Sequence, residues 1–333
     1  MRFSILVVVL TWLISLKSSS TALDPALEDA WRDWKGTHEK EYAEGEESFR
    51  RDIWERNLRM IQEHNREADL GKHTYWLGMN HLGDLTHEEV NQRLSSFQLD
   101  GADQLTGNVT FFQASANLQL PKKVDWRTKG YVTAVKDQGD CRSCWAFSAT
   151  GALEALHFKE TRKLVSLSEQ NLVDCSKKPN NGCRGGSPCT AFEYVMNQGI
   201  NSEEDYPYDG KVGNCRYNPR TFTSTCGSIK RIERKDESSL AQAVATAGPI
   251  SVGLDGRANH FHFYKSGIFS CPWHGVVVLN HAMLIVGYGR HKNTDFWIVK
   301  NSWSTSWGED GYMRLEKGSN TCGIADLACY PIK

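Results

Sequence analysis

The chain has 333 residues, and its 39 Lys and Arg almost balance its 40 Asp and Glu, so the formal net charge is −1. Nucleic-acid binding depends on clustered positive charge, and because the basic residues here are scattered, the composition gives no reason to expect it. No metal-ligand spacing occurs, and no cofactor is expected. All ten cysteines lie at or after Cys141, which is typical of a disulfide-bearing domain preceded by a cysteine-free segment.

Residues 1–22 have the pattern of a secretory signal peptide. Arg2 precedes an apolar run from Phe3 to Leu16, and small residues lead to Ala22, after which cleavage is expected. The run is too short to span a membrane comfortably, and no other stretch is long and apolar enough. The mature protein is therefore expected to have no membrane span and to fold in an oxidising compartment.

The segment 23–119 is rich in charge and in helix-forming residues. Six of its residues recur at steps of three or four, which places them on one stripe of a helix. A stripe that faces an apolar core rarely carries Glu, Arg and two Asn, so this one is expected to satisfy a polar network. The six are Glu46, Arg50, Trp54, Asn57, Ile61 and Asn65.

Around Cys144 the sequence predicts a helix that begins at a thiol. From Cys144 to Lys159 there is no Pro, and apolar residues recur near helical spacing. At a helix N-terminus the amide N–H groups and the dipole favour an anion, which lowers a thiol pKa from about 8.5 toward roughly 3.5 to 7.5. Cys144 is thus a candidate nucleophile. The Cys141-x-x-Cys144 pair could also indicate a redox or zinc motif, but no second pair and no thioredoxin-like βαβ pattern accompany it.

Helical patterns give way to strands along the rest of the chain. The capping box at residues 166–169, opened by Ser166, predicts a helix start, and another helix is expected from Ser187 to Asn197, stopped near Gly199. Strands are predicted over residues 250–255, 282–289, 296–302 and 311–316. The first part is therefore expected to be helical and the second part rich in strands, an arrangement that fits an α+β fold.

A reactive thiol also needs a base and a group that orients the base. His281 follows Cys144 by 137 residues and Asn301 follows it by 157, the second spacing being slightly longer than the about 130 to 150 of the papain-type signature. With Trp145 after the thiol and Ser302-Trp303 after Asn301, the chain resembles papain-family cysteine peptidases, close to the cathepsin L, K and S group, over nearly its whole length.

The resemblance implies a papain-like two-lobed fold, in which a helical lobe carries Cys144 and a barrel-like antiparallel β lobe carries His281 and Asn301. Cys144 would attack a peptide carbonyl, His281 would move the proton, and Asn301 would orient the imidazole. Gln138 and the backbone N–H of Cys144 would form the oxyanion hole. Trp303 would shield the contact made by Asn301 from water.

The resemblance extends to a helical inhibitory propeptide. The helix stripe is similar to the ERFNIN signature with Trp54 in place of Phe, and residues 78–84 are similar to the GNFD motif with Leu82 in place of Phe. The implied division is a signal peptide at 1–22, a propeptide at 23–119 and a peptidase domain at 120–333. Asn108 begins the sequon Asn-Val-Thr and is expected to be glycosylated.

The charges of the two parts suggest how the propeptide is released. Residues 23–119 carry 10 Lys and Arg and 19 Asp and Glu, hence −9, and residues 120–333 carry 27 and 21, hence +6. The hypothesis is that protonation of paired propeptide carboxylates near pH 4 to 5 weakens this attraction.

Three disulfides are implied by the resemblance: Cys141–Cys183, Cys175–Cys215 and Cys271–Cys322. Cys189, Cys226 and Cys329 remain. A fourth bridge between Cys189 and Cys329 is conceivable because both lie next to positions that flank the substrate cleft in the family, but two buried free thiols are the expectation.

The same resemblance implies an apolar pocket, S2, for the second residue before the cut, with Leu, Val or Pro preferred there. The residues that would line it are Ser187, Pro188, Gly253, Leu279, Ala282 and Leu327. The protein is expected to be a monomer, with protein substrates and cystatin-type inhibitors as partners, in the lysosome or the extracellular space. The residues expected to bind substrate are Gly185, Gly186, Ser187, Pro188, Gly253, Leu279, Ala282, Leu327 and Trp303.

Three positions depart from the family pattern: Arg142 and Ser304 replace Gly, and Arg184 replaces Gly or a small polar residue. An added Cβ at Arg142 can introduce backbone strain. The side chain of Arg142 either points into solvent or forms a cationic rim that favours acidic residues at the first position before the cut. A catalytically silent peptide-binding protein and an inhibitor acting through its propeptide-like part are the alternatives to an enzyme, and the intact set of Cys144, His281, Asn301 and Gln138 argues against both.

Overall fold

The computed structural model describes residues 23–94, 105, 108–272 and 275–333. The expected signal peptide lies outside these residues. Within them, no helix is both long enough and apolar enough to cross a bilayer.

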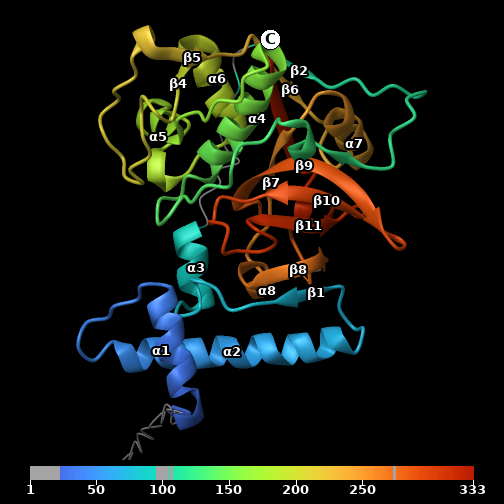
Figure 1. Ribbon diagram of the computed structural model, residues 1–333. Helices are drawn as coiled ribbons and strands as arrows, with labels where there is room; N and C mark the ends of the chain where they lie inside the picture. The colour runs from blue at the N-terminus through green and yellow to red at the C-terminus, as the bar shows by residue number, and fades with distance from the viewer. Residues whose placement is uncertain (1–22, 95–104, 106–107, 273–274) are drawn as a thin grey trace, which may run out of the picture.

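The N-terminal part is a helical unit that lies against one side of the remaining chain (Figure 1). Helices α1 (Glu28–Thr37) and α2 (Glu47–Asp69) cross each other, and α3 (His87–Leu94) leads toward the rest of the molecule. Trp31, Trp34 and Trp54 form a small core at the crossing, with the first two rings stacked at 5.3 Å. This aromatic core fixes the angle between α1 and α2.

The predicted polar stripe on α2 is confirmed as a network of hydrogen bonds to the chain that follows it. Asn57 donates to the carbonyls of Gly83 and Leu85, at 2.8 and 3.1 Å. Asn65 both donates to and accepts from the backbone of Leu77. The amides of the buried Asn57 and the half-buried Asn65 therefore satisfy backbone groups of the segment 77–85, which ends in a turn.

The helical lobe is built around α4 (Cys144–Thr161), which is apolar on all sides and buried along most of its length, as expected of a central helix. Helices α5 (Glu169–Cys175) and α6 (Pro188–Gln198) pack beside it (Figure 1), and the short strands β4 (Ile200–Asn201) and β5 (Phe222–Ser224) form a separate pair. The helix that ends at Gly199 is confirmed.

The start of α5 differs from the prediction. The capping residue is Ser168, whose Oγ accepts from the backbone N–H of Asn171 at 2.9 Å, so the prediction that a capping box at Ser166 opens this helix is wrong. Both serines fit a capping pattern, and the N–H group within reach of the hydroxyl decides between them.

The second lobe is a strongly curved sheet in the order β1-β8-β11-β10-β9-β7-β12-β6-β2, with β3 paired to β9. The four predicted strands are present as β7 (Ile250–Leu254), β9 (His281–His291), β10 (Thr294–Lys300) and β11 (Tyr312–Glu316). Further elements of this part are β3 (Val124–Asp125), β6 (Ser228–Arg231), α7 (Glu237–Thr246), α8 (Asn259–His262), β8 (Tyr264–Phe269) and β12 (Leu327–Ile332).

Both ends of this sheet are formed by segments from before residue 120. Strand β1 (Tyr75–Leu77) pairs antiparallel with β8, and β2 (Val109–Phe111) pairs parallel with β6. Strand addition of this kind binds a segment by main-chain hydrogen bonds at an exposed sheet edge. The segment before residue 120 is therefore bound to the sheet lobe by strand pairing at both edges of the sheet.

Four disulfides join eight of the cysteines, and Cys144 and Cys226 are not in any of them. Three have the pairing that the resemblance implied: Cys141–Cys183, Cys175–Cys215 and Cys271–Cys322. The fourth is Cys189–Cys329, so the expectation of two free thiols there is wrong. Although 140 residues separate the two cysteines in the sequence, their Cα atoms lie 5.9 Å apart, which allows a disulfide.

Candidate active site

The packing of α4 against β9 brings the thiol and the imidazole to one end of a shared interface. Cys144 is the first residue of α4 and is fully buried, and His281 is the first residue of β9. One turn into α4, Ser148 Oγ donates to the carbonyl of Met283, two residues along β9, at 2.7 Å. This bond sets the register between helix and strand, so their first residues face the same end.

Asn301 holds the imidazole of His281. Its Oδ1 lies 2.8 Å from Nε2 of His281 and also accepts from the backbone N–H of Ser302 at 2.8 Å. Because Nε2 must carry the proton to donate in this contact, neutral His281 has its lone pair on Nδ1. Nδ1 is buried and has no hydrogen-bond partner in the part of the chain that the structure describes.

Aromatic rings surround the His281–Asn301 contact. The ring of Trp303 lies 4.7 Å from that of His281, and the ring of Phe261 lies 6.1 Å away on an edge-to-face approach. His281 is 2% exposed. Burial lowers its pKa to about 4, although the bond to Asn301 acts in the opposite direction. The imidazole is therefore neutral at neutral pH in this form of the protein.

Gln138 is fully buried and fixed at both ends of its amide. Its Nε2 donates to the carbonyl of Cys141 at 3.2 Å, and its Oε1 accepts from Ser302 Oγ at 2.7 Å. Its backbone N–H donates to the carbonyl of Ser302 at 2.9 Å, and its carbonyl accepts from the hydroxyl of Tyr208. The amide N–H groups of Gln138 thus lie beside the loop that leads to Cys144, with Tyr208 as an anchor that the sequence did not reveal.

The predicted pocket residues come from both lobes. Leu327, Gly253 and Ala282 are direct neighbours across β12, β7 and β9 and form one row of the sheet. Pro188 is the first residue of α6, which packs against β7 and β12, and Ser187 is the N-cap residue of this helix; both residues are buried. Cys144, Leu279, Ala282 and Leu327 belong to a single hydrophobic cluster, and Leu105, from before residue 120, packs against it.

The two glycines before α6 meet different constraints. Gly185 has φ +115°, in the region that favours glycine. A Cβ on Gly186 would lie 2.5 Å from Oδ1 of Asn180 and 2.7 Å from the Trp145 ring, so no side chain fits there. Both therefore hold the backbone that leads to Ser187 in a form that few other residues allow.

The departures from the family pattern are placed differently from what the sequence suggested. Arg142 is half-buried and is not among the described residues with positive φ, so its backbone has no left-handed conformation that would require glycine. Ser304 has φ +63°, so this is the position at which glycine would relieve backbone strain. Arg184 is exposed.

A buried ionic network lies behind the site and was not predicted. Lys136 Nζ lies 2.6 Å from Glu169 and 3.3 Å from Glu154, and Lys300 Nζ donates to the carbonyl of Thr133 at 2.9 Å. Although burial opposes ionisation, Lys136 and Lys300 hold the pKa of Glu154 below its usual value. Burial raises the pKa of Glu169 to about 7. Charged residues from both lobes thus meet beneath Asn301, beside a small cavity.

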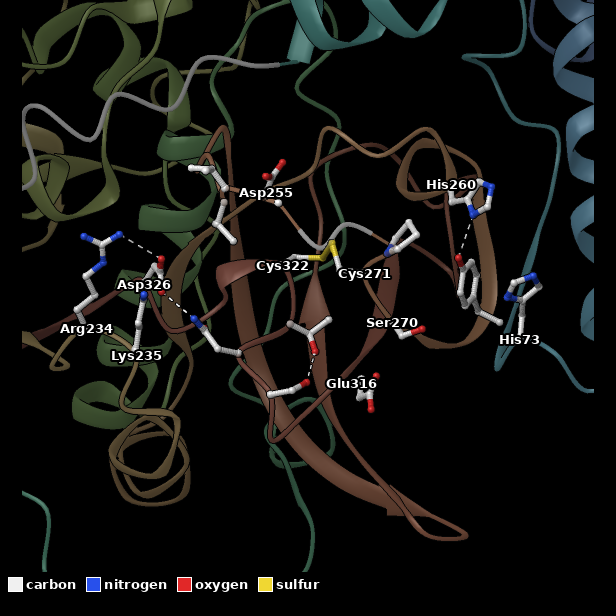
Figure 2. Close-up of a pocket in the computed structure, with 18 residues that line it drawn as sticks. His73, Arg234, Lys235, Asp255, His260, Ser270, Cys271, Glu316, Cys322 and Asp326 are labelled. Atoms are coloured by element: carbon white, nitrogen blue, oxygen red, sulfur yellow. Dashed lines mark hydrogen bonds and ion pairs between the residues drawn. A yellow bond between two sulfur atoms is a disulfide. The ribbon is translucent and has the colours of Figure 1, made fainter.

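A cavity of about 920 Å³ lies elsewhere, around the Cys271–Cys322 disulfide (Figure 2). Its walls include His73 and Tyr75 from the N-terminal part and His260 from the sheet lobe, and neither Cys144 nor His281 is among them. No group of three or more His, Cys, Asp or Glu suited to a metal occurs among the residues described.

Comparison with known proteins accounts for both parts of the chain. Residues 120–332 match the papain family cysteine protease model, and residues 31–90 match the cathepsin propeptide inhibitor domain (I29) model. Human cathepsin L2 is 45% identical, with 97% of this chain and 98% of that protein covered, and bovine cathepsin S is 46% identical with the same coverage.

The solved structure of digestive procathepsin L 3 from the larval midgut of Tenebrio molitor superposes with a TM-score of 0.86 at 38% identity, covering 93% of this chain and all of that one. The structure of a recombinant stem bromelain precursor superposes with a TM-score of 0.83 at 33% identity, covering 92% of this chain and 99% of that one. The papain-like fold with a helical propeptide is thereby confirmed. The chain belongs to the papain family of cysteine proteases and carries a cathepsin-type inhibitory propeptide.

Proposed function

We propose that the chain is a cysteine endopeptidase in which Cys144 and His281 act as an acyl-transfer pair. The thiolate of Cys144 attacks the peptide carbonyl, and imidazolium His281 gives its proton to the departing amine as the C–N bond breaks. A thioester remains on Cys144. Neutral His281 then takes a proton from water, the hydroxide attacks the thioester, and the acid product leaves the thiolate behind.

The observation that carries this proposal is the 2.8 Å contact between Asn301 and His281 at the end of the interface where α4 begins with Cys144. The contact fixes which ring nitrogen faces away from Asn301, and the helix start favours an anion at the thiol. Gln138 Nε2 and the backbone N–H of Cys144 would stabilise the oxyanion, where one donor contributes about 3 to 4 kcal/mol.

The propeptide, which we assign to residues 23–119 after a signal peptide at 1–22, keeps the peptidase domain at 120–333 inactive until it is removed. Beyond the two edge strands, Arg93 Nη1 lies 3.3 Å from Asp140 beside the site, and Asn80 Nδ2 donates to the carbonyl of His262 at 2.8 Å. Acidification weakens this attachment by protonating groups on both sides of the contact.

Pro188, Leu279, Ala282 and Leu327 are buried and apolar, and we propose that they line the S2 pocket, which would then prefer Leu, Val or Pro at the second residue before the cut. We further propose that the enzyme is a monomer inhibited by cystatin-type proteins, which reach it in the lysosome or the extracellular space. Asn108 is exposed, which is compatible with glycosylation of the propeptide.

Titration of the acid-processed protein with an epoxide that alkylates activated thiols tests the proposal. We expect one label on Cys144 and cleavage of a Leu-containing peptide in proportion to the label, with Cys144→Ala as the unlabelled control. Complete propeptide removal without labelling would overturn the enzyme assignment and favour a peptide-binding protein that does not cut.

A further inference from the structure

The Cys189–Cys329 disulfide joins the two lobes, unlike the other three bridges. Cys141–Cys183 and Cys175–Cys215 lie within the helical lobe, and Cys271–Cys322 lies within the sheet lobe. Cys189 is the second residue of α6, and Cys329 is the third residue of β12. Both are fully buried, so the bond crosses the contact between lobes in their shared core.

The sheet end of this bridge lies one side-chain row below the pocket. Leu327 pairs with Gly253 in the pocket row, and Cys329 pairs with Ser251 two residues further along the same strands. Side chains two residues apart in a strand share a face and are separated by roughly 6.5 to 7 Å. The sulfur of Cys329 therefore leaves the sheet on the same face as Leu327.

The helix end lies equally close to the opposite wall. Cys189 directly follows Pro188, and Ser187 precedes that proline. Asn180 Oδ1 accepts from the backbone N–H of Ser187 at 2.8 Å and from Thr190 Oγ1 at 2.6 Å, which attaches the start of α6 to its own lobe. The disulfide attaches that same turn to the sheet, so the start of α6 is held from both sides.

We propose that the Cys189–Cys329 disulfide is a specificity determinant: it fixes the separation of the two pocket walls and restricts the pocket to aliphatic side chains. The inference rests on the proposed function, because the pocket receives substrate only if the chain cuts peptides. A wall held only by non-covalent packing shifts to admit a larger group, whereas a covalent tie one row away limits that shift. The disulfide therefore excludes the larger side chain of Phe from the pocket.

The test compares Leu and Phe at the second substrate position in two variants. Replacing Cys189→Ala together with Cys329→Ala removes the bond. The matched control is Cys226→Ala, which removes a buried, unbridged thiol whose Sγ lies 3.5 Å from the carbonyl of Phe192, further along α6. Active-site titration of each protein comes first, because a wild type that takes no label refutes the proposed function and not this inference.

For titratable protein, we expect the ratio of kcat/KM for Leu over Phe to fall at least about tenfold in the double variant and to stay at the wild-type value in Cys226→Ala, since a hydrophobic pocket discriminates by about 10- to 200-fold per methylene. An unchanged ratio in the double variant overturns the inference. If that variant does not fold, Cys189→Val with Cys329→Ala refills the volume with apolar atoms and gives the same comparison without the bond.

Discussion

Oδ1 of Asn301 accepts from both the ring of His281 and the N–H of Ser302, each at 2.8 Å, so one oxygen links the orientation of the imidazole to the backbone of the loop. We expect Asn301→Ala to lower kcat/KM by about 10- to 100-fold, because a hydrogen bond to a charged group contributes about 1.5 to 3 kcal/mol. Kinetics with a Leu-containing peptide, normalised to titrated sites, measure the loss.

The control is Asn301→Asp, which keeps the acceptor and adds a negative charge near His281. It should recover activity and move the alkaline limb of the pH profile upward, since a carboxylate stabilises the imidazolium. Full activity of Asn301→Ala would contradict the assigned role.

The propeptide contact contains His260, a histidine of the sheet lobe whose protonation opposes docking. The ring of His64 lies 4.2 Å from that of His73 and 4.6 Å from that of His260. The hydroxyl of Tyr75 lies 2.9 Å from Nδ1 of His260, and a dashed line marks this contact at His260 in Figure 2. Burial, with His64 and His73 nearby, lowers the pKa of His260 to about 4. The carboxylate that faces this cluster is Glu67, 3.1 Å from His73 and 2.9 Å from Lys72.

The direction of the pH effect on docking follows from the protonation of His260 in the free and docked forms. Free histidine titrates near 6.5, so above that pH both forms are neutral and His260 has no effect on docking. As the pH falls from about 6.5 to 4, the free form gains a proton that the docked form resists, and docking weakens. We expect His260→Gln to shift half-maximal processing to a lower pH.

Processing is followed by gel electrophoresis across a pH series, with His291→Gln as the control, because His291 is an exposed residue at the end of β9. An identical midpoint for wild type and His260→Gln would exclude this cluster and leave the propeptide carboxylates as the acid-sensitive groups.

The buried network behind Asn301 should contribute to stability through Lys136. In Lys136→Met, Glu154 and Glu169 lose their shared cation, and breaking a buried pair by removal of one partner costs about 3 to 5 kcal/mol. We expect a lower unfolding midpoint in urea at pH 7, measured on the Cys144→Ala background to prevent self-digestion.

The loss should shrink at pH 5. Without Lys136, the folded-state pKa values of both carboxyls rise, and an acid with a raised pKa destabilises the fold only above its unfolded pKa. An equal loss at the two pH values would show that the methionine acts through packing and not through the uncompensated charges.

The sequence predicted the features that are local in the chain. The helix at Cys144, the helix stopped by Gly199 and the four long strands each have a periodicity or an end signal within a few residues. Strands β1 and β2 have three residues each, too few to show a period, and they form only because a sheet edge lies beside them.

Features that depend on distant residues were missed for the same reason. The sequence alone gives no reason to connect four charged residues that folding brings together: Lys136, Glu154, Glu169 and Lys300. The Cys189–Cys329 bond could be considered from the sequence but not decided, because spacing alone does not establish connectivity. The connectivity becomes clear only in the folded chain, where α6 packs against β12.

Ser304 gives a last test, of backbone conformation. At φ +63° a residue with a side chain lowers the stability of the folded state by roughly 1 to 2 kcal/mol, and glycine avoids this strain. Glycine also makes the unfolded chain more flexible, which lowers stability by about 0.4 to 1 kcal/mol. We therefore expect Ser304→Gly to stabilise the proenzyme by up to about 1 kcal/mol and Ser304→Val to destabilise it, as read from the thermal midpoint. Arg142→Gly is the matched control: with no positive φ to relieve, it should not raise the midpoint, and a rise there equal to that of Ser304→Gly would refute the conformational explanation.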